Sequence, residues 1–309
     1  VLSVVDDDLS FSEMILLETA KKKMFNVRST RVRPGLDDKI LTSWNGLMLG
    51  AIARASVVLG DESYLDAAEK NLSFLKDNLW DDKNKRLYHR WRDGSRDDAQ
   101  IFDTHAYLLS GIVELYGASL KSEYLSFAIE IADRMIEAFY DPEAGGFYQS
   151  TGTKDLIIRL KEDYDGAEPS GNSVAVLALL KLAAITGKES YRQTADKTLG
   201  YFSGRMKSMA VAVPYMVSAA DFASREPNRV VIAGSVDSSK AKELLRAAHS
   251  VYQPHKVILG TNGPIEEFAK SLAGGDKGDV AAFLCKGKHC ELPTSDPNKL
   301  QGLLLKSAE

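Results

Sequence analysis

Hydrophobic residues follow a helical period along most of the chain, in alternating apolar and amphipathic stretches. Three stretches are apolar on nearly every side, which is typical of helices buried on both faces. They are residues 47–59, 106–116 and 174–185. Each is followed, after a short turn, by an amphipathic stretch that begins at Tyr64, Tyr124 or Tyr191. The pattern therefore predicts a repeated helical hairpin with an inner apolar helix and an outer amphipathic one.

The hairpin recurs with a period of about 60 residues, whereas solenoid repeats usually have ~34–47. Its return segments, residues 81–88 and 141–148, combine Asp with Gly or Asn and an aromatic residue. That composition is typical of turns and short β-hairpins. Further helices are expected at residues 11–25 and 212–223. Long return loops favour a closed α/α toroid over an open solenoid, so we predict three complete hairpins flanked by two further helices.

The pattern changes near residue 225, where short β-branched and apolar runs appear. Strands are expected at residues 229–233, 256–260 and 280–285, and a helix at residues 238–250. A strand–helix–strand order of this kind predicts a small α/β unit. We therefore expect a mainly α protein, with a partial α/α toroid in residues 1–224 and a small α/β C-terminal region in residues 225–309.

Polar residues gather in three segments where the inner helices begin. The segments are residues 33–46, 102–106 and 159–173. They occupy the same phase of the repeat, so in a toroid they are expected to meet at one mouth of the ring. Ser43 is predicted to cap the helix that follows the first segment, and Ser170 or Asn172 the helix that follows the third.

These segments suit a carbohydrate, which proteins hold with aromatic faces and with side chains that bond hydroxyl groups. Asp38, Asp165 and Glu168 are candidate acids and bases for glycoside hydrolysis. His105 is a candidate base for sugar epimerisation, because histidine titrates near neutrality. The expected substrate-binding residues are Trp44, Asn45, Asp103, Arg159, Lys161, Tyr164 and Asn172.

Structural roles remain open for the same residues. Capping alone explains Ser43 and Ser170, and carboxylates near helix starts also complement the helix dipole. Trp44 fits the hydrophobic core as well as a sugar platform. A single histidine such as His105 is also compatible with a buried structural role.

Composition narrows the function classes. The chain has 309 residues, 44% hydrophobic and 27% charged, the balance of an ordinary globular protein. A formal net charge of −4 argues against a nucleic-acid binder, and no stretch approaches the ~18 apolar residues of a membrane span. Cys285, His289 and Cys290 fall short of the four ligands of a structural zinc site. We expect no metal and no other cofactor.

Two blocks of the sequence carry a family resemblance. They are residues 37–48 (DDKILTSWNGLM) and 167–173 (AEPSGNS), and Cys285, Cys290 and Pro293 resemble a third block. With these blocks the chain resembles the spermatogenesis-associated protein 20 family, the thioredoxin-domain-containing YyaL-like proteins. The resemblance implies an N-terminal thioredoxin-like domain followed by a six-hairpin toroid similar to glycosidases and N-acylglucosamine 2-epimerases. Family members usually have an acidic-Asp-Tyr-Ala sequence where this chain has Asp103-Thr104-His105-Ala106.

The resemblance sets two hypotheses for function. In the first, the toroid binds or modifies a small carbohydrate as an epimerase, isomerase or glycosidase. In the second, it is a non-catalytic or redox-regulatory scaffold for the thioredoxin-like domain. Because the predicted hairpins cannot close a six-hairpin ring, we expect Val1 to be a cut and the missing N-terminal part of the same protein to be a partner. We expect an intracellular, cytoplasmic protein, with any targeting signal upstream of Val1.

Overall fold

The computed structural model describes residues 8–152, 156–272, 280–287 and 289–307. The chain divides into two compact units, Val1–Asp38 and Lys39–Glu309. The first unit contains α1 (Phe11–Ser29), which begins with a capping box between Ser10 and Glu13. No residue of α1 is buried. The helix expected at residues 11–25 is therefore present and extends to Ser29.

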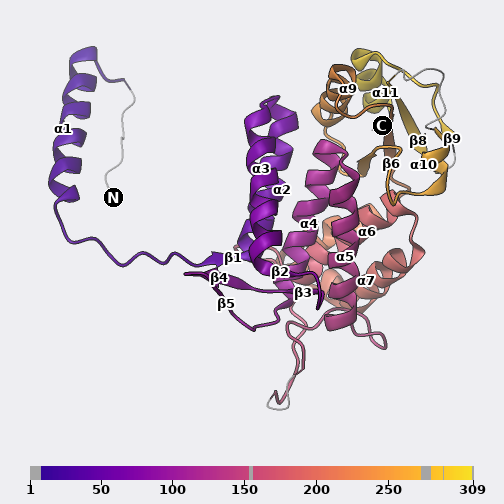
Figure 1. Ribbon diagram of the computed structural model, residues 1–309, viewed down its shortest axis with the longest axis horizontal. Coiled ribbons are helices and arrows are strands. Elements are labelled where there is room, and N and C mark those ends of the chain that lie inside the picture. The colour runs from indigo at the N-terminus through magenta and orange to yellow at the C-terminus, as the bar shows by residue number, and fades with distance from the viewer. Residues whose placement is uncertain (1–7, 153–155, 273–279, 288, 308–309) are drawn as a thin grey trace. The chain divides into compact units, whose positions relative to one another are not determined.

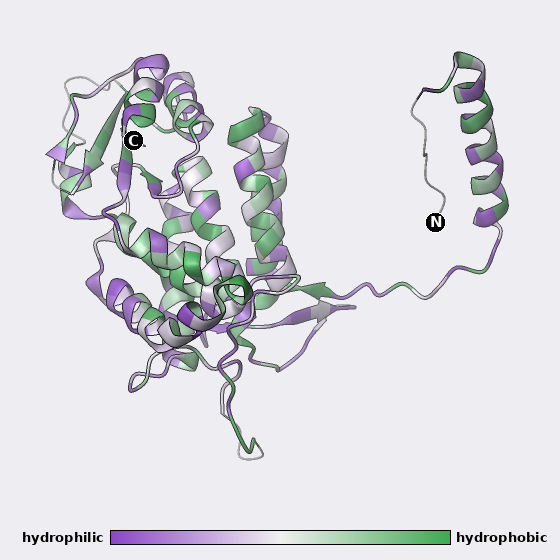
Figure 2. Cartoon of the chain, turned by 180° about the vertical axis from the view of Figure 1, so that it is seen from behind, coloured by the Kyte–Doolittle hydropathy of each residue, from purple (hydrophilic) through white to green (hydrophobic). Residues whose placement is uncertain are grey.

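The second unit begins with helical hairpins that form a partial α/α toroid (Figure 1). The inner helices are α2 (Thr42–Leu59), α4 (Phe102–Ser119), α6 (Gly171–Thr186) and α8 (Pro214–Ala223). The outer helices are α3 (Glu62–Leu79), α5 (Ser122–Phe139) and α7 (Glu189–Met209). Each inner helix packs against the next, and each outer helix packs on its own partner. The outer α7 is more hydrophilic than α6 beneath it (Figure 2), so the predicted hairpin order is confirmed.

Two glycines allow the first inner helices to approach at backbone distance. A Cβ atom at Gly111 of α4 would lie 2.3 Å from the carbonyl oxygen of Gly46 in α2. A Cβ atom at Gly46 would lie 2.6 Å from the backbone nitrogen of Leu108. Larger residues here would force α2 and α4 apart, so these glycines set the spacing at which the inner helices pack.

Short β-hairpins connect the helices, as the turn composition predicted. β2 (Trp80–Asp81) pairs with β3 (Arg86–Leu87), and β1 (Ile40–Leu41) pairs with β4 (Arg90–Arg92), which also pairs with β5 (Ser95–Arg96). Because β1 runs directly into α2, that helix begins earlier than expected and its N-cap is Leu41. The capping role predicted for Ser43 is therefore wrong.

The C-terminal residues form the expected α/β module. Its strands are β6 (Asn228–Ala233), β7 (Lys256–Leu259), β8 (Ala281–Lys286) and β9 (His289–Cys290). Its helices are α9 (Ser239–Ser250), α10 (Glu267–Ser271) and α11 (Pro297–Lys306). The sheet order is β7-β6-β8-β9, with β6 and β7 parallel and the other pairs antiparallel. Val231, Leu259 and Cys285 share one core cluster with the inner helices, so module and toroid form a single compact unit. The boundary drawn between residues 224 and 225 remains a prediction.

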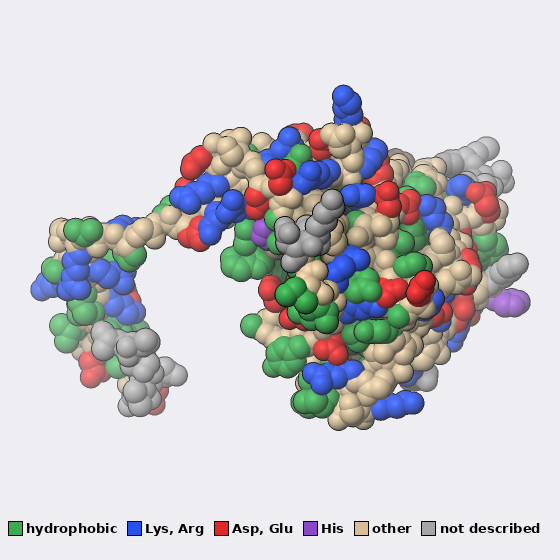
Figure 3. Space-filling view, turned by 90° about the horizontal axis from the view of Figure 1, so that it is seen from below, with side chains coloured by type: hydrophobic (Ala, Val, Ile, Leu, Met, Phe, Trp, Pro, Cys, Tyr) green, Lys and Arg blue, Asp and Glu red, His purple; other side chains and the backbone are tan. Residues whose placement is uncertain are grey.

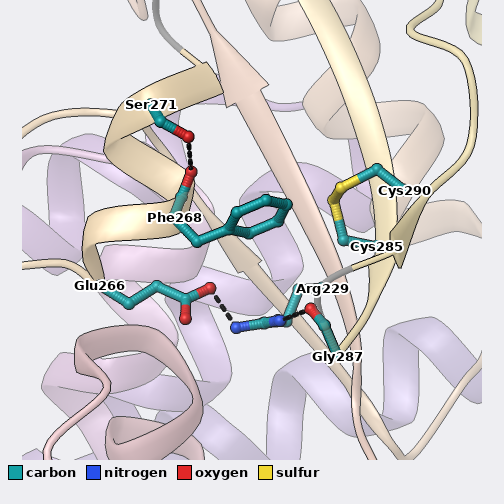
Figure 4. Close-up of a disulfide and its surroundings, with 7 residues drawn as sticks. All are labelled: Arg229, Glu266, Phe268, Ser271, Cys285, Gly287 and Cys290. Carbon is teal, nitrogen blue, oxygen red and sulfur yellow. Dashed lines mark hydrogen bonds and ion pairs between the residues drawn. A yellow bond between two sulfur atoms is a disulfide. The ribbon is translucent and has the colours of Figure 1, made fainter.

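A disulfide joins Cys285 of β8 to Cys290 of β9 (Figure 4). The two residues face each other across the strand pair. Beside it, the guanidinium of Arg229 bonds the Glu266 carboxylate and the Gly287 carbonyl. The backbone nitrogen of Glu266 donates to the Ile185 carbonyl at the end of α6, at 3.0 Å. This chain of contacts attaches the module to the inner helices.

No helix in the described part of the chain is long and apolar enough to cross a membrane. Within the same residues, the His, Cys, Asp and Glu side chains form no group that could hold a metal ion.

Candidate functional site

The inner helices α2, α4 and α6 begin at the same end of the toroid (Figure 1), and Asp165 joins the start of α8 to that of α6. We call this end, with the loops that precede the helices, the loop mouth; Figure 3 views the molecule from this side. Backbone contacts join these starts to the preceding loops. The backbone nitrogen of Thr42 donates to the His89 carbonyl at 2.9 Å, and that of Phe102 to the Gln149 carbonyl at 3.0 Å. Segments far apart in sequence therefore meet at this end, as the repeat phase predicted.

Asp103 is a carboxyl group of the loop mouth with a raised pKa. It lies in the first turn of α4, and its Oδ1 atom is buried with no hydrogen-bond partner among the described residues. Burial, together with the negative charges of Glu162 and Glu168, raises the Asp103 pKa to about 6. A Cβ atom at Gly171 would lie 2.1 Å from this Oδ1. Glycine at the start of α6 is therefore what leaves room for the Asp103 carboxyl.

Two further carboxylates and a tyrosine surround Asp103. Tyr107, one turn along α4, donates its hydroxyl to the Pro169 carbonyl at 2.5 Å. The side chains of Glu162 and Glu168 are exposed, and Gln149 donates to Glu162 at 2.6 Å. The result is an acidic centre in which one buried carboxyl lies near two solvated carboxylates.

Asp165 acts as a positioning residue. Its Oδ1 accepts from the backbone nitrogen of Ser170 at 2.8 Å, and its Oδ2 accepts from that of Tyr215 at 2.8 Å. It thereby ties the start of α6 to the start of α8 and holds the turn that carries Glu168. Both of its oxygens are bonded to helix starts, and the catalytic role of Asp165 stays a prediction. The predicted N-cap at Ser170 is confirmed, because its hydroxyl accepts from the Ser173 backbone at 3.2 Å.

Asn172 and Lys161 fix the long return loop before α6. Asn172 is fully buried and bonds both backbone groups of Phe147, at 2.8 and 3.0 Å. Lys161, whose side chain is 5% exposed, pairs with Asp141 at 2.7 Å. The hydrogen bond from Lys161 holds the Asp141 pKa well below its usual range. In this structure both side chains bond the protein itself, and their substrate-binding roles stay predictions.

Of the remaining predicted site residues, some are exposed and others bond neighbouring parts of the protein. Trp44 is 61% exposed and Tyr164 is 58% exposed, so both aromatic faces are available. Arg159 instead lies 3.9 Å from the centre of the Tyr148 ring and donates to the Ser150 carbonyl. Asn45 accepts from Asn71 of α3 at 2.7 Å, which directs it toward the outer helix. Asp38 belongs to the first unit, outside the unit that forms the loop mouth.

His105 is wholly buried and does not reach the loop mouth. Its Nδ1 donates to the Ile101 carbonyl at 3.2 Å, and its ring lies 5.0 Å from that of Phe139. Burial lowers its pKa to about 4, so it is a neutral core residue. The role of epimerase base predicted for His105 stays a prediction, made at a position that is wholly buried. Thr104 is buried too, where it contacts Nδ1 of His89 at 3.1 Å.

Glu162, Tyr107 and Gln149 were not among the predicted site residues. Tyr107 lies four residues after Asp103 and therefore on the same face of α4, a spacing the sequence already contained. Gln149 and Glu162 meet only because the return loop folds back between Phe147 and α6. No spacing rule in the sequence encodes that loop path.

Comparisons with known proteins agree with this architecture. Residues 83–239 match the family model described as glycosyl hydrolase family 47. Over 305 residues the chain is 32% identical to spermatogenesis-associated protein 20 of Homo sapiens, covering 94% of this chain and 39% of that protein. Over 111 residues it is 29% identical to the endoplasmic reticulum mannosyl-oligosaccharide 1,2-alpha-mannosidase of Schizosaccharomyces pombe, covering 35% and 20%. A solved GH76 alpha-mannanase of Bacteroides thetaiotaomicron has a TM-score of 0.49 at 17% identity, covering 70% of this chain and 59% of that one.

The inner and outer helices with their loop mouth define a glycosidase-like α/α toroid. The chain belongs to the spermatogenesis-associated protein 20 family and, through residues 83–239, to glycosyl hydrolase family 47. It spans about two fifths of the length of the curated relatives it matches, 39% of the human protein.

Proposed function

We propose that the loop mouth binds a carbohydrate and that Asp103 donates a proton to it as a general acid. The observation that carries this proposal is the Oδ1 atom of Asp103, which is buried without a hydrogen-bond partner among the described residues, near two exposed carboxylates. This setting raises the Asp103 pKa to about 6. A carboxyl that keeps part of its proton near neutral pH is suited to protonating a leaving oxygen.

The neighbouring carboxylates supply the second group that glycoside cleavage requires. One carboxyl protonates the glycosidic oxygen, and the other acts as base or nucleophile. Glu162 and Glu168 are the candidates for the second role. The exposed faces of Trp44 and Tyr164 lie at the same end of the toroid and suit stacking against a sugar ring. The match to a glycosyl hydrolase family and the similarity to a mannosidase support a sugar as the ligand.

The experiment combines binding and turnover on a panel of mono- and disaccharides that includes mannobiose and cellobiose. The wild-type protein is expected to show a thermal shift and slow turnover with at least one member. Asp103→Asn is expected to lower turnover by about 100-fold while ligand binding persists. Glu143→Gln, an exposed carboxylate change on a neighbouring loop, is the matched control. Absence of both binding and turnover in the wild type would overturn the proposal.

The alternative proposal is a non-catalytic or redox-regulatory scaffold that works with an N-terminal thioredoxin-like domain. The cross-strand disulfide between Cys285 and Cys290 favours this alternative. A thiolate of another domain can open such a disulfide by thiol–disulfide exchange, and the reverse exchange forms it again. Under this alternative, no sugar is turned over and Asp103→Asn leaves every measured property but stability unchanged.

A further inference from the structure

A cavity of about 560 Å³ lies between the inner helices and the C-terminal module. The last turns of α2, α4 and α6 line one side, together with α8, and residues 249–258 of the C-terminal module line the other. We call it the basal pocket. Its volume falls within the range of about 300–1,000 Å³ that is usual for small-molecule sites.

A single carboxylate, Glu114 of α4, lies in the basal pocket between two cations. Its Oε1 lies 2.6 Å from Nζ of Lys181, and its Oε2 lies 3.4 Å from the guanidinium of Arg54. Although burial raises its pKa, the charges of Lys181 and Arg54 outweigh burial and lower it to about 2. Glu114 is therefore ionised and neutralises one of the two cations.

The C-terminal module contributes a third cation, Lys256, to the basal pocket. Lys256 of β7 donates Nζ to the carbonyls of Ala248 and Val251 at the end of α9. Burial, and then the nearby charge of Arg54, lower its pKa to about 8. Lys256 is therefore still mainly protonated at pH 7.

Two further groups of the basal pocket, His249 and Tyr215, are neutral at pH 7. His249 lies 3.0 Å from the Gly117 carbonyl through Nε2, and burial lowers its pKa to about 4. Burial also raises the pKa of Tyr215. Three cations against one carboxylate leave two positive charges without a counter-charge among the described residues that line the pocket. Partly buried positive charge is costly unless an anion compensates it.

We propose that the basal pocket binds a small phosphate monoester, with the phosphate group against Arg54, Lys181 and Lys256. A phosphate monoester carries about −1.5 to −2 charge at pH 7, which matches the two uncompensated positive charges. Lysine and arginine are the usual partners of phosphate oxygens. The cavity is several times larger than a phosphate group, so it has room for an organic part of about sugar size beside the apolar walls.

The test is calorimetric titration of the full chain with glucose 6-phosphate, inorganic phosphate and glucose. Glucose 6-phosphate is expected to bind more tightly than inorganic phosphate, and glucose is expected not to bind at this site. Arg54→Gln and Lys256→Gln are each expected to weaken glucose 6-phosphate binding by about tenfold. The Arg54 side chain is 61% exposed, so Arg54→Gln is expected to fold, and a thermal melt checks it.

Lys240→Gln is the matched control, because it removes one exposed charge from α9 outside the basal pocket. It is expected to leave binding unchanged, and equal weakening by this variant would show diffuse attraction in place of a site. Absence of binding by both phosphate compounds, or full affinity in both pocket variants, would overturn the proposal. Asp103→Asn is expected to leave this titration unchanged, so the result is separate from the proposal for the loop mouth.

Discussion

Two partly buried carboxyl groups on one face of α4 have pKa values shifted in opposite directions. Asp103 and Glu114 are eleven positions apart in the sequence, which is close to three helical turns and about 16 Å along the axis. The Asp103 pKa is raised to about 6, and the Glu114 pKa is lowered to about 2. Burial acts in the same direction on both.

The difference comes from the neighbouring charges. Asp103 lies near Glu162 and Glu168, whereas Glu114 contacts Lys181 and Arg54. One helix thus carries a carboxyl that retains a proton at the loop mouth and a permanently charged one at the basal pocket. The first suits proton transfer, and the second holds cations in place. Variants that alter the surroundings of one of these two carboxyl groups should leave the other unchanged.

The largest effect is expected from Lys181→Met, which removes the closer partner of Glu114. Lys181 and Glu114 are 17% and 20% exposed, and loss of Lys181 leaves Glu114 with only the longer contact to Arg54. Loss of one partner of a largely buried pair typically costs about 3 kcal/mol. Urea unfolding should therefore show a loss of about 3 kcal/mol. Arg54→Gln is the matched comparison, since Arg54 is 61% exposed and its loss should cost less than about 1 kcal/mol. Equal costs for the two variants would contradict the view that burial of the pair decides its strength.

Gly171→Ala changes the other end of α4's surroundings, at the loop mouth beside Asp103. A Cβ atom there would meet Oδ1 of Asp103 at 2.1 Å, so the carboxyl or α6 must move, at a cost of about 2 kcal/mol. Gly200→Ala in α7 is the control, because its Cβ atom would meet nothing within 4 Å. That change should be neutral or stabilise the helix by up to about 1 kcal/mol. Thermal unfolding of both variants compares them, and equal behaviour would refute the close contact.

Asp103→Asn is expected to stabilise the protein at pH 7. A folded-state pKa of about 6, above the ordinary value of 3.8 for an aspartate, means that ionised Asp103 opposes folding above pH 6. The gain should be about 1 to 2 kcal/mol at pH 7, and it should vanish as the pH falls from 6 to below 4. Unfolding at several pH values measures it. A pH-independent difference would show that charge is not the cause.

The sequence predicted the helices better than the site. Helices follow from local apolar periodicity, whereas the site depends on contacts between segments distant in the sequence. Apolar periodicity located every inner helix, and the hairpin turns followed from Asp and Gly. The start of α2 was misplaced because β1 pairs with β4, a contact between distant segments. Carboxylates near the helix starts were found, but their roles were not. Asp165 bonds α8, His105 lies in the core, and Asp103 gains its unusual pKa only from the folded return loop.

The smallest effect concerns the pH dependence of the basal pocket. Between pH 7 and 9, Lys256 is the facing group that loses charge, since its pKa is about 8. Lys181 is paired with ionised Glu114, and His249 and Tyr215 are neutral. Glucose 6-phosphate affinity should therefore fall several-fold, by about 1 kcal/mol, over this range. Titrations of Lys256→Gln should show a flat profile, and a fall as steep as that of the wild type would assign the pH dependence to another group.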